Sequence, residues 1–489
     1  MRRLLSLLAL LTLAPRGAGA TRPNIVFLLS DDHATSAISA YGPSHLSGFA
    51  NTPNIDRIAR DGMLFRNCYV ANSICTPSRA AILTGEHSHH NGVYTLQDAI
   101  DPKKHHLAHW FNDAGYQTAF FGKWHLESTP QGFQTWAIYR GQGEYFNPVY
   151  LTPDAPKKGH VEQGYADDLT TDKALGWMEH RDPAKPFLLC LWFKSPHRNW
   201  MPPPRYLSRF KDDTIPEPGN LLDDWSHRSV ALSRNHQTVG RDMRMKEDLK
   251  DGIPAGLTGD ALRRAAYQHY AKDYVNTAQA MDDNVGRVLD WLKANGLDQD
   301  TIVVYSSDQG FFVGEHGLFD KRWMYEESEH MPLIIRAPGL TRPGSECREL
   351  VSNIDFAPTL LALAGIAAPS EPADRFDGAS FAPMLSGSTP AGWRDAVYYR
   401  YWEHNSAEHP VPGHFGIRTA THKIICYQGQ PHGMKAANPK PTPEEWELFD
   451  LVKDPHEMRN VYDDPAYAQV RAELTARLKA ERERIGDTR

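Results

Sequence analysis

The segment NIVFLLSDDH, residues 24–33, places a run of apolar residues directly before two adjacent aspartates. A short apolar run of this kind predicts a strand that is buried on both faces, as in parallel sheets. Three later segments repeat the pattern: TAFFGKWHL at 118–126, PFLLCLWFKSPH at 186–197 and TIVVYSSDQG at 301–310. Helical stretches are expected between these strands, for example over Thr52 to Gly62, His106 to Ala114 and Ala261 to Ala294. This alternation predicts an α/β fold with a doubly wound sheet.

Polar side chains follow all four predicted strands. The carboxyl ends of parallel strands share one edge of the sheet, and ligands bind in the crevice beyond that edge. The residues expected there are Asp31, Asp32, Lys123, His125, His197 and Asp308. The sequence therefore predicts one site assembled from four distant segments.

A second unit is expected after a connecting stretch from Ile366 to Trp393, which is rich in Pro, Ala, Gly and Ser. Its apolar segments are closely spaced and predict a small antiparallel sheet: AVYYRYWEH, HFGIRTAT, HKIICYQ and WELFDL. A charged helix is expected from about Ala466 to Ile485. We predict a large α/β domain over residues 21–370 and a C-terminal subdomain over residues 371–489.

The first twenty residues, MRRLLSLLALLTLAPRGAGA, combine two arginines, an apolar stretch and a small-residue end. This pattern is typical of a secretory signal peptide cleaved after Ala20, and it predicts export to the periplasm or the extracellular space. A retained N-terminal anchor is the alternative. No later segment offers the roughly 20 apolar residues that a membrane span needs, so no span is expected in the mature form.

Composition narrows the class of protein. The 489-residue chain has a formal net charge of −7 and no basic stripe, which argues against nucleic acid as a partner. Its hydrophobic fraction of 41% is that of a globular protein. Five cysteines are too few for a disulfide framework, even in an exported protein.

The segment CTPSRAAILTG, residues 75–85, predicts a short helix with Cys75 at its N-terminus, because Pro77 suits a first helical position and Gly85 suits the position just past the end. The free N–H groups and the dipole at a helix N-terminus favour a thiolate or an anionic ligand, and Arg79 lies one turn further on. The alternative is a buried structural cysteine beside a capping turn.

The aspartates at the strand ends suggest a metal. Asp31 and Asp32 alone could cap a helix or form a turn. Asp308, with the carboxamide of Gln309 beside it, completes an all-oxygen ligand set suited to Ca²⁺ or Mg²⁺. The histidine-rich run EHSHHNGV, residues 86–93, lacks HExxH spacing, which disfavours zinc.

A hard cation near Arg79, Lys123 and Lys321 would make a strongly positive pocket, which suits a tetrahedral anion such as sulfate or phosphate. His125 and His197 could move protons near neutral pH, one to activate a nucleophile and one to protonate a leaving oxygen. Together these residues could hydrolyse an ester.

The motifs resemble those of type I sulfatases, whose signature is Cys-x-Pro-x-Arg. RPNIVFLLSDDH, TPNIDRIARDGMLF, AGYQTAFFGKWHL, SPHRNW, SSDQGFFVGEHGLFDKRWMYEES and WELFDLVKDPHEMRNV match that family in order, from about residue 22 to the C-terminus. The resemblance implies an alkaline-phosphatase-like fold. It also implies that a formylglycine-generating maturation enzyme oxidises Cys75, and that one hydroxyl of the hydrated aldehyde attacks sulfur while the other later expels sulfate.

The resemblance also implies roles for the other residues. Ca²⁺ would be bound by Asp31, Asp32, Asp308, Gln309 and the modified Cys75. Arg79 would stabilise the hydrate and His125 would be the base, while Lys123, His197 and Lys321 would hold the sulfate and His197 would protonate the leaving group. Many relatives have Asn or His at the position of Gln309, and close relatives often have Arg at that of His330.

The segments YRGQGEYFNP, SPHRNWMPPPRYL and GEHGLFDKRWMYEES look most similar to bacterial carbohydrate sulfatases of the N-acetylglucosamine-6-sulfatase kind. This implies exo-acting 6-O-desulfation of heparan-type or mucin-type glycans. The candidate sugar contacts are Arg198, Asn199, His316 and His414, each of which could instead be a structural hydrogen-bonding group.

Three alternatives remain open. The enzyme could act on another sugar position or on a small sulfate ester. It could be a phosphate or phosphonate monoester hydrolase, which would share the fold class, the anion pocket and the metal requirement. It could also be a glycan-binding homologue without catalysis, in which Cys75 is never oxidised.

Overall fold

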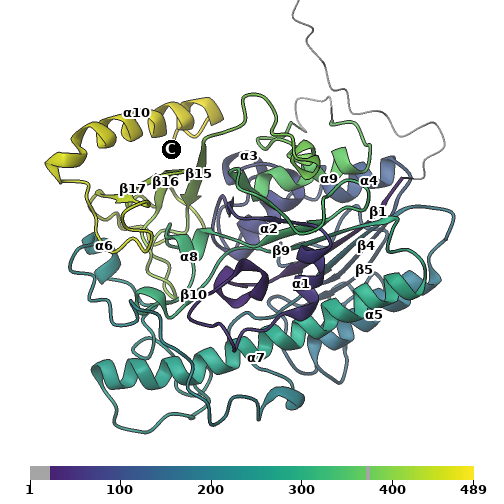
Figure 1. Cartoon of the computed structure of the whole chain (residues 1–489), viewed down its shortest axis with the longest axis horizontal. Coiled ribbons are helices and arrows are strands. Elements are labelled where there is room, and N and C mark those ends of the chain that lie inside the picture. Colours follow the sequence, from purple (N-terminus) through teal and green to yellow (C-terminus); the bar gives the residue numbers. More distant parts are fainter. Residues whose placement is uncertain (1–21, 370–374) are drawn as a thin grey trace, which may run out of the picture.

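A ten-stranded mixed sheet forms the centre of the computed structural model, which describes residues 22–369 and 375–489 (Figure 1). Its strands, in spatial order, are β13 (Ser345–Cys347), β2 (Met63–Phe65), β12 (Leu333–Arg336), β9 (Thr301–Ser307), β1 (Asn24–Ser30), β8 (Phe187–Trp192), β4 (Gln117–Gly122), β5 (Thr135–Tyr139), β6 (Val149–Leu151) and β7 (His160–Val161). The run β9-β1-β8-β4-β5 is parallel throughout. The four strands predicted from the apolar runs are therefore adjacent in the sheet.

Helices cover both faces of the sheet. Strand β1 shows this, since it is buried along its whole length and its alternate residues point to opposite faces. Ile25, Phe27 and Leu29 belong to one apolar cluster, whereas Val26 and Leu28 belong to another. The first face carries α2 (Cys75–Thr84), α4 (Leu107–Asp113) and α9 (Phe356–Leu363). The second carries α1 (Pro53–Arg60), α5 (Ala166–His180) and α7 (Gly259–Ala294). The predicted doubly wound, alkaline-phosphatase-like architecture is confirmed.

A separate four-stranded antiparallel sheet follows, as predicted. It consists of β15 (Ala396–Tyr401), β16 (His414–Thr419), β17 (His422–Tyr427) and β18 (Glu445–Asp450), and α10 (Ala468–Ile485) packs on it (Figure 1). The predicted boundary at residue 370 falls in residues 370–374, and the predicted signal peptide falls in residues 1–21. Both lie outside the described residues and stay predictions.

A buried ionic cluster links this second sheet to the large domain. Lys423 of β17 lies 2.6 Å from Glu329 and 3.0 Å from Glu326, both in α8 (Glu326–Glu329), and 2.6 Å from Glu457. Burial raises the pKa of Glu329 to about 8, despite the nearby Lys423. The cluster therefore holds more carboxylates than its cations neutralise.

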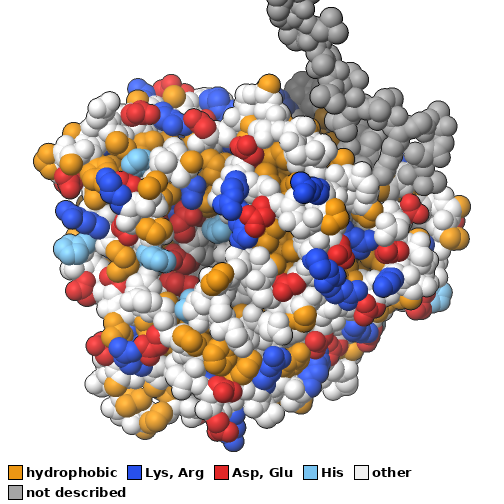
Figure 2. All heavy atoms as spheres, viewed as in Figure 1, with side chains coloured by type: hydrophobic (Ala, Val, Ile, Leu, Met, Phe, Trp, Pro, Cys, Tyr) orange, Lys and Arg blue, Asp and Glu red, His pale blue; other side chains and the backbone are white. Residues whose placement is uncertain are grey.

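The remaining elements are short. They are β3 (Cys68–Tyr69), β10 (Phe312–Val313), β11 (Phe319–Asp320), β14 (Val351–Ser352), α3 (Ser88–Asn91) and α6 (Val230–Ser233). Acidic and basic side chains are interspersed over the face seen in Figure 2. Across residues 22–369 and 375–489, no helix is both long enough and apolar enough to cross a membrane.

Candidate active site

Helix α2 positions Cys75 at the carboxyl edge of the parallel strands. Cys75 is the first residue of the helix, and Gly85 ends it in the left-handed conformation with φ of 72°, as the sequence predicts. The hydroxyl of Ser78 donates to the carbonyl of Asp308, which ties the first turn of α2 to the end of β9. Cys75 is only 1% exposed, so the fold fixes its side chain.

Polar groups surround the Cys75 sulfur. Its Sγ lies 3.5 Å from Oδ1 of Asp31, 3.6 Å from Nζ of Lys123 and 3.7 Å from Nε2 of Gln309. Burial, reinforced by the charge of Asp31, raises the pKa of the thiol to about 12. Of the two possibilities offered for this helix terminus, a thiolate and an anionic ligand, burial disfavours the thiolate.

Three buried aspartates meet beside Cys75. Asp31, Asp32 and Asp308 each offer an oxygen, and these oxygens lie within 4.8 Å of one another. Burial and the charge of Asp31 raise the pKa of Asp308 to about 7, and burial also raises the pKa of Asp32. For Asp31, nearby cations, Lys123 foremost, outweigh burial and hold the pKa well below its usual range. Crowding the three carboxylates together is thus unfavourable without a strong positive charge.

Gln309 provides an independent indication of a cation. Its Nε2 donates to Oδ1 of Asp32 at 2.5 Å, whereas its Oε1 is buried without a hydrogen-bond partner among the described residues. A buried acceptor of this kind is costly unless something binds it. Three carboxylates and one free amide oxygen fit a hard cation such as Ca²⁺. These four residues offer the all-oxygen ligand set that the sequence predicts.

Three cationic side chains pair with these carboxylates. Arg79 donates through Nε to Oδ2 of Asp308 at 2.9 Å, and Lys123 pairs with Asp31. Nζ of Lys321 lies 2.7 and 2.6 Å from the two oxygens of Asp32. The three predicted anion-binding cations thus converge on one buried point.

The two predicted histidines approach the same point from the ends of β4 and β8. Nδ1 of His197 lies 2.6 Å from the carbonyl oxygen of Arg198 and so donates to it, while Nε2 lies 3.8 Å from Oδ2 of Asp32. His125 adopts a positive φ of 53°, and its Nδ1 is buried without a partner among the described residues. Burial and the charge of Lys123 lower the pKa of both imidazoles well below the usual range.

A cavity of about 160 Å³ opens above Cys75. Of the residues singled out from sequence, it is lined by Cys75, His197, Arg198, Asn199 and Lys321. Sequence reasoning missed the other lining residues: Leu96, Gln142, Arg244, Glu247, Asp248, Asp320, Arg322, Glu408 and His409. Most of these lie on loops without any periodic signal. The C-terminal unit closes one side of the cavity through Glu408 and His409.

One wall of the cavity is fixed by a buried ion pair. Arg198 binds Asp248 through two hydrogen bonds of 2.7 and 2.5 Å, and the backbone N–H of Arg244 donates to the same carboxylate at 2.7 Å. Nζ of Lys250 donates to the carbonyl oxygens of Asn199 and Trp200 at 2.8 and 3.1 Å. The segment after β8 that carries His197 is therefore held by the loop containing residues 244–250.

A second charged group in the lining is centred on Asp320. Nη1 of Arg322 donates to Oδ1 of Asp320 at 2.7 Å, and Nδ1 of His409 lies 3.5 Å from Oδ2 of the same residue. Burial and the charge of Arg322 lower the pKa of His409 to about 3, so its ring is neutral. These side chains present both hydrogen-bond donors and acceptors to the cavity.

His316 and His414, which the sequence suggested as sugar contacts, lie elsewhere. His316 is buried between Asp223 at 3.2 Å and Glu327 at 3.6 Å, and the charge of Glu327 outweighs burial and raises its pKa to about 9. His414 is buried against the rings of Trp323 and Tyr399, and its Nδ1 donates to the carbonyl oxygen of Pro412 at 2.8 Å. Both histidines therefore have the surroundings of a structural hydrogen-bonding group, which is the alternative to a sugar contact given above.

The histidine run at residues 86–93 lies against the C-terminal part of the chain. His89 contacts the carbonyl oxygen of Ile485 at 2.9 Å, and His90 pairs with Asp377 at 2.8 Å. Within the described parts of the chain, the groups able to hold a metal are Asp31, Cys75 and His197, and Asp31, Asp32 and Asp308. The run contributes to neither group.

Comparison with known proteins gives the family. The model of the sulfatase family matches residues 23–366, and that of the C-terminal part of N-sulphoglucosamine sulphohydrolase matches residues 314–484. An N-acetylglucosamine-6-O-sulfatase from Bacteroides thetaiotaomicron is 40% identical, over 98% of this chain and 90% of that protein. An arylsulfatase from Clostridium perfringens is 28% identical, over 92% of each chain.

A solved structure shares both fold and sequence. It holds a protein in complex with its substrate D-glucosamine-2-N,6-O-disulfate, and it superposes with a TM-score of 0.88 at 40% identity, over 96% of this chain and 99% of that one. The family match covers the strand ends, α2 and the buried residues around Cys75, namely Asp31, Asp32, Arg79, Lys123, His125, His197, Asp308, Gln309 and Lys321. The chain therefore belongs to the sulfatase family and is a sulfuric ester hydrolase.

Proposed function

We propose that the protein is an exo-acting N-acetylglucosamine-6-O-sulfatase that uses Ca²⁺ and a formylglycine made from Cys75, and that it acts on heparan-type or mucin-type glycans. The observation that carries the proposal is the cavity of about 160 Å³ above Cys75. A cavity of this size, lined by Arg198, Glu408 and His409 among others, favours a terminal sugar over the interior of a chain.

The identity of the sugar rests on relatives. The relative that is 40% identical over almost the whole chain carries the name of this activity, and the solved neighbour binds a glucosamine with a 6-O-sulfate. The donors and acceptors of Asp320, Arg322 and His409 supply groups able to hydrogen-bond sugar hydroxyls. Arg198 and Asn199 remain candidate sugar contacts because they line the same cavity.

The donor set supports both cofactors. Asp31, Asp32, Asp308 and Oε1 of Gln309 would hold Ca²⁺, with the modified side chain at position 75 beside them. When present, the metal and the hydrated aldehyde would supply an activated hydroxyl nucleophile, which a thiol with a pKa of about 12 does not provide. Arg79 would orient this group through its contact with Asp308.

The remaining residues would bind the sulfate and move protons. Lys123 and Lys321 would face its oxygens and neutralise the charge that develops on them. His197 would protonate the leaving alcohol. Burial and the nearby cations, Lys123 foremost, lower the pKa of His197, and an anionic sulfate bound among these cations would offset their share and favour the protonated ring. His125, whose Nδ1 has no partner among the described residues, would serve as the base that returns the site to its starting state.

The proposal also covers export and maturation of the protein. The first 20 residues would direct export to the periplasm or the extracellular space, and a formylglycine-generating enzyme would oxidise Cys75. The division into a catalytic domain over residues 21–370 and a C-terminal subdomain over residues 371–489 is part of the same proposal.

The test is sulfate release from a panel of defined sugars: N-acetylglucosamine 6-sulfate, N-acetylglucosamine 3-sulfate, galactose 6-sulfate and N-acetylglucosamine 6-phosphate. Peptide mass measurement confirms formylglycine at position 75 before the assay. We expect release from the 6-sulfated amino sugar, and a rate on the phosphate ester at least 100-fold lower, since a phosphate monoester carries more charge than the site is arranged to neutralise.

Other results would reject parts of the proposal. Release from galactose 6-sulfate or the 3-sulfate alone would reject the sugar assignment. Faster turnover of the phosphate ester would reject the sulfate assignment. Binding of the 6-sulfated sugar without release, despite confirmed formylglycine, would favour a glycan-binding protein.

A further inference from the structure

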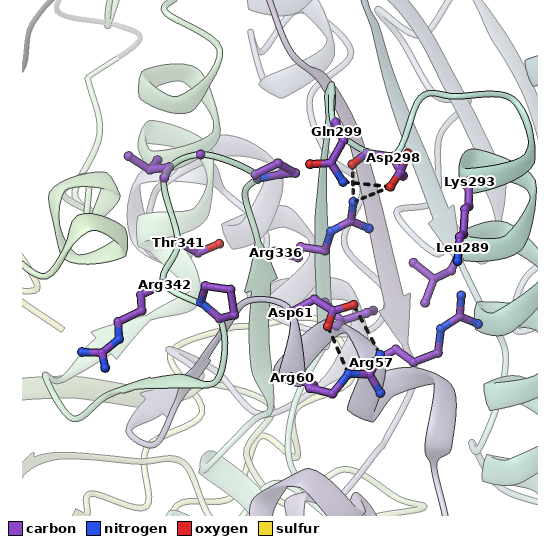
Figure 3. Close-up of a pocket in the computed structure, with 15 residues that line it drawn as sticks. Arg57, Arg60, Asp61, Leu289, Lys293, Asp298, Gln299, Arg336, Thr341 and Arg342 are labelled. Atoms are coloured by element: carbon purple, nitrogen blue, oxygen red, sulfur yellow. Dashed lines mark hydrogen bonds and ion pairs between the residues drawn. The ribbon is translucent and has the colours of Figure 1, made fainter.

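A second and larger cavity, of about 720 Å³, lies where α1 and α7 end and where the chain leaves β12 (Figure 3). Five cationic side chains line it, against the two carboxylates of Asp61 and Asp298: Arg57, Arg60, Lys293, Arg336 and Arg342. This concentration of positive charge contrasts with the net charge of −7 of the whole chain. The lining of this cavity is therefore locally positive.

Not all of these cations are neutralised. Arg57 pairs with Asp290 at 2.7 Å, Arg60 with Asp61 at 3.1 Å and Arg336 with Asp298 at 3.9 Å.

Lys293 and Arg342 are exposed and make no ion pair with any described residue. Figure 3 shows these two side chains on opposite sides of the cavity, with Arg336 between them. Free cations spaced across a cavity suit an extended ligand that carries several negative charges, rather than a single small ion.

The cavity lies at the opposite edge of the sheet from the catalytic cavity. Asp298 and Gln299 line it just before β9 begins, whereas Asp308 follows the end of β9. A strand of seven residues separates the two edges by about 20 Å at roughly 3.3 Å per residue. A ligand in this cavity thus leaves the catalytic site free.

We infer that this cavity is a second binding site for a sulfated glycan chain, contacted by Lys293, Arg342 and Arg336. The inference rests on the proposed function, in which the substrate is the end of such a chain. Sulfate groups pair well with guanidinium and ammonium groups, and the side chain of Gln299 adds a polar contact for a carbohydrate. Binding a neighbouring chain here raises the local concentration of chain ends at the catalytic site.

The test compares charge-reversed variants of the full-length enzyme. The variant Lys293→Glu/Arg342→Glu removes the two unpaired cations. The control Lys103→Glu/Lys157→Glu changes net charge by the same amount at exposed positions outside the cavity. A milder variant, Lys293→Gln/Arg342→Gln, serves if the charge-reversed protein does not fold. Binding of a size-defined heparin octasaccharide is measured by calorimetry, alongside kcat/KM on N-acetylglucosamine 6-sulfate.

We expect octasaccharide binding to weaken about tenfold in the charge-reversed variant and less than twofold in the control, because two exposed ion pairs are lost only in the former. Turnover of the monosaccharide stays within twofold in both. Equal weakening in both variants would overturn the inference, since general charge would then explain binding. Equal binding of a DNA duplex at the same salt, with the same loss, would overturn the assignment to a glycan.

The two proposals fail in different ways. An enzyme that turns over the monosaccharide but does not bind the octasaccharide at this cavity refutes only the second site. An enzyme that releases no sulfate from any sugar refutes the proposed function, whatever the binding result.

Discussion

Replacing Asp248 tests whether this residue, which has no proposed role in the reaction itself, positions His197. The carboxylate of Asp248 is fully buried, and its partner Arg198 is 19% exposed. The variant Asp248→Ala leaves the guanidinium of Arg198 largely buried without a counter-charge and removes the acceptor for the N–H of Arg244. The carbonyl of Arg198 in turn accepts from Nδ1 of His197, so movement of this segment reorients the imidazole.

The magnitude follows from burial. Breaking a fully buried ion pair costs about 3–5 kcal/mol, and the partial exposure of Arg198 puts this pair at the lower end, about 3 kcal/mol. The double variant Arg198→Met/Asp248→Leu replaces the pair with apolar groups and loses only about 1 kcal/mol, since no charge is left buried. In Asp248→Ala we expect kcat/KM to fall at least tenfold, because a small misplacement of a catalytic group costs about that much or more.

Urea unfolding of the wild type, Arg198→Met, Asp248→Leu and Arg198→Met/Asp248→Leu gives the coupling energy, and steady-state sulfate release by Asp248→Ala gives the kinetic effect. If the loss of unfolding free energy in the double variant equals the sum of the two single losses within about 0.5 kcal/mol, the two side chains are not coupled. A kcat/KM unchanged in Asp248→Ala would show that the pair does not position His197.

Three further predictions concern the nucleophile, the metal and the ionic cluster. Cys75→Ala should abolish sulfate release while the far-ultraviolet circular dichroism and the melting temperature stay as in the wild type; any retained turnover would contradict the role of this residue. Ca²⁺ at about 100 times its Kd should stabilise the protein by about 2.7 kcal/mol in thermal unfolding, and Asp308→Asn should remove most of that gain, whereas an equal gain in the variant would exclude Asp308 as a ligand. The pKa of Glu329 is raised by burial from 4.5 to about 8, so the fold favours its neutral form; its contribution to stability is present below pH 4.5 and is lost as pH rises through 8. Glu329→Gln should therefore flatten the fall in unfolding free energy between pH 4.5 and pH 8, and curves that stay parallel to the wild type would count against this assignment.

Sequence reasoning located the strands better than their directions. The apolar runs that precede Asp31, Lys123, Lys194 and Asp308 all became adjacent parallel strands. Strand β12 has a similar apolar character, yet it runs antiparallel between β9 and β2. Periodicity reports burial of a strand but not its direction, which depends on how the chain returns to the sheet.

The spacing of elements along the sequence located site residues best where a residue follows a strand or begins a helix. Asp31, Asp308, His197 and Cys75 are of this kind. Asp248 and His409 reach the cavity from irregular loops far away in sequence, and no spacing rule connects them to it. His316 and His414 lie outside the lining of the cavity, His316 between two carboxylates and His414 against aromatic rings, so a polar residue beside a motif need not line the cavity.

The central position of β1 has a consequence for how the protein acquires its activity. Asn24 and Thr301 are neighbours across β1 and β9 although 277 residues separate them, whereas each pairing in the C-terminal sheet joins strands consecutive in sequence. Contacts between distant parts of a chain form slowly, because a long loop must close before they yield any stabilisation. The C-terminal sheet can therefore form quickly once its four strands have been synthesised, whereas the pairing of β1 with β9 requires more than half of the chain to emerge and a long loop to close. Because Asp31 and Asp308 meet only through that pairing, the enzyme has no functional folding intermediate that lacks its central sheet.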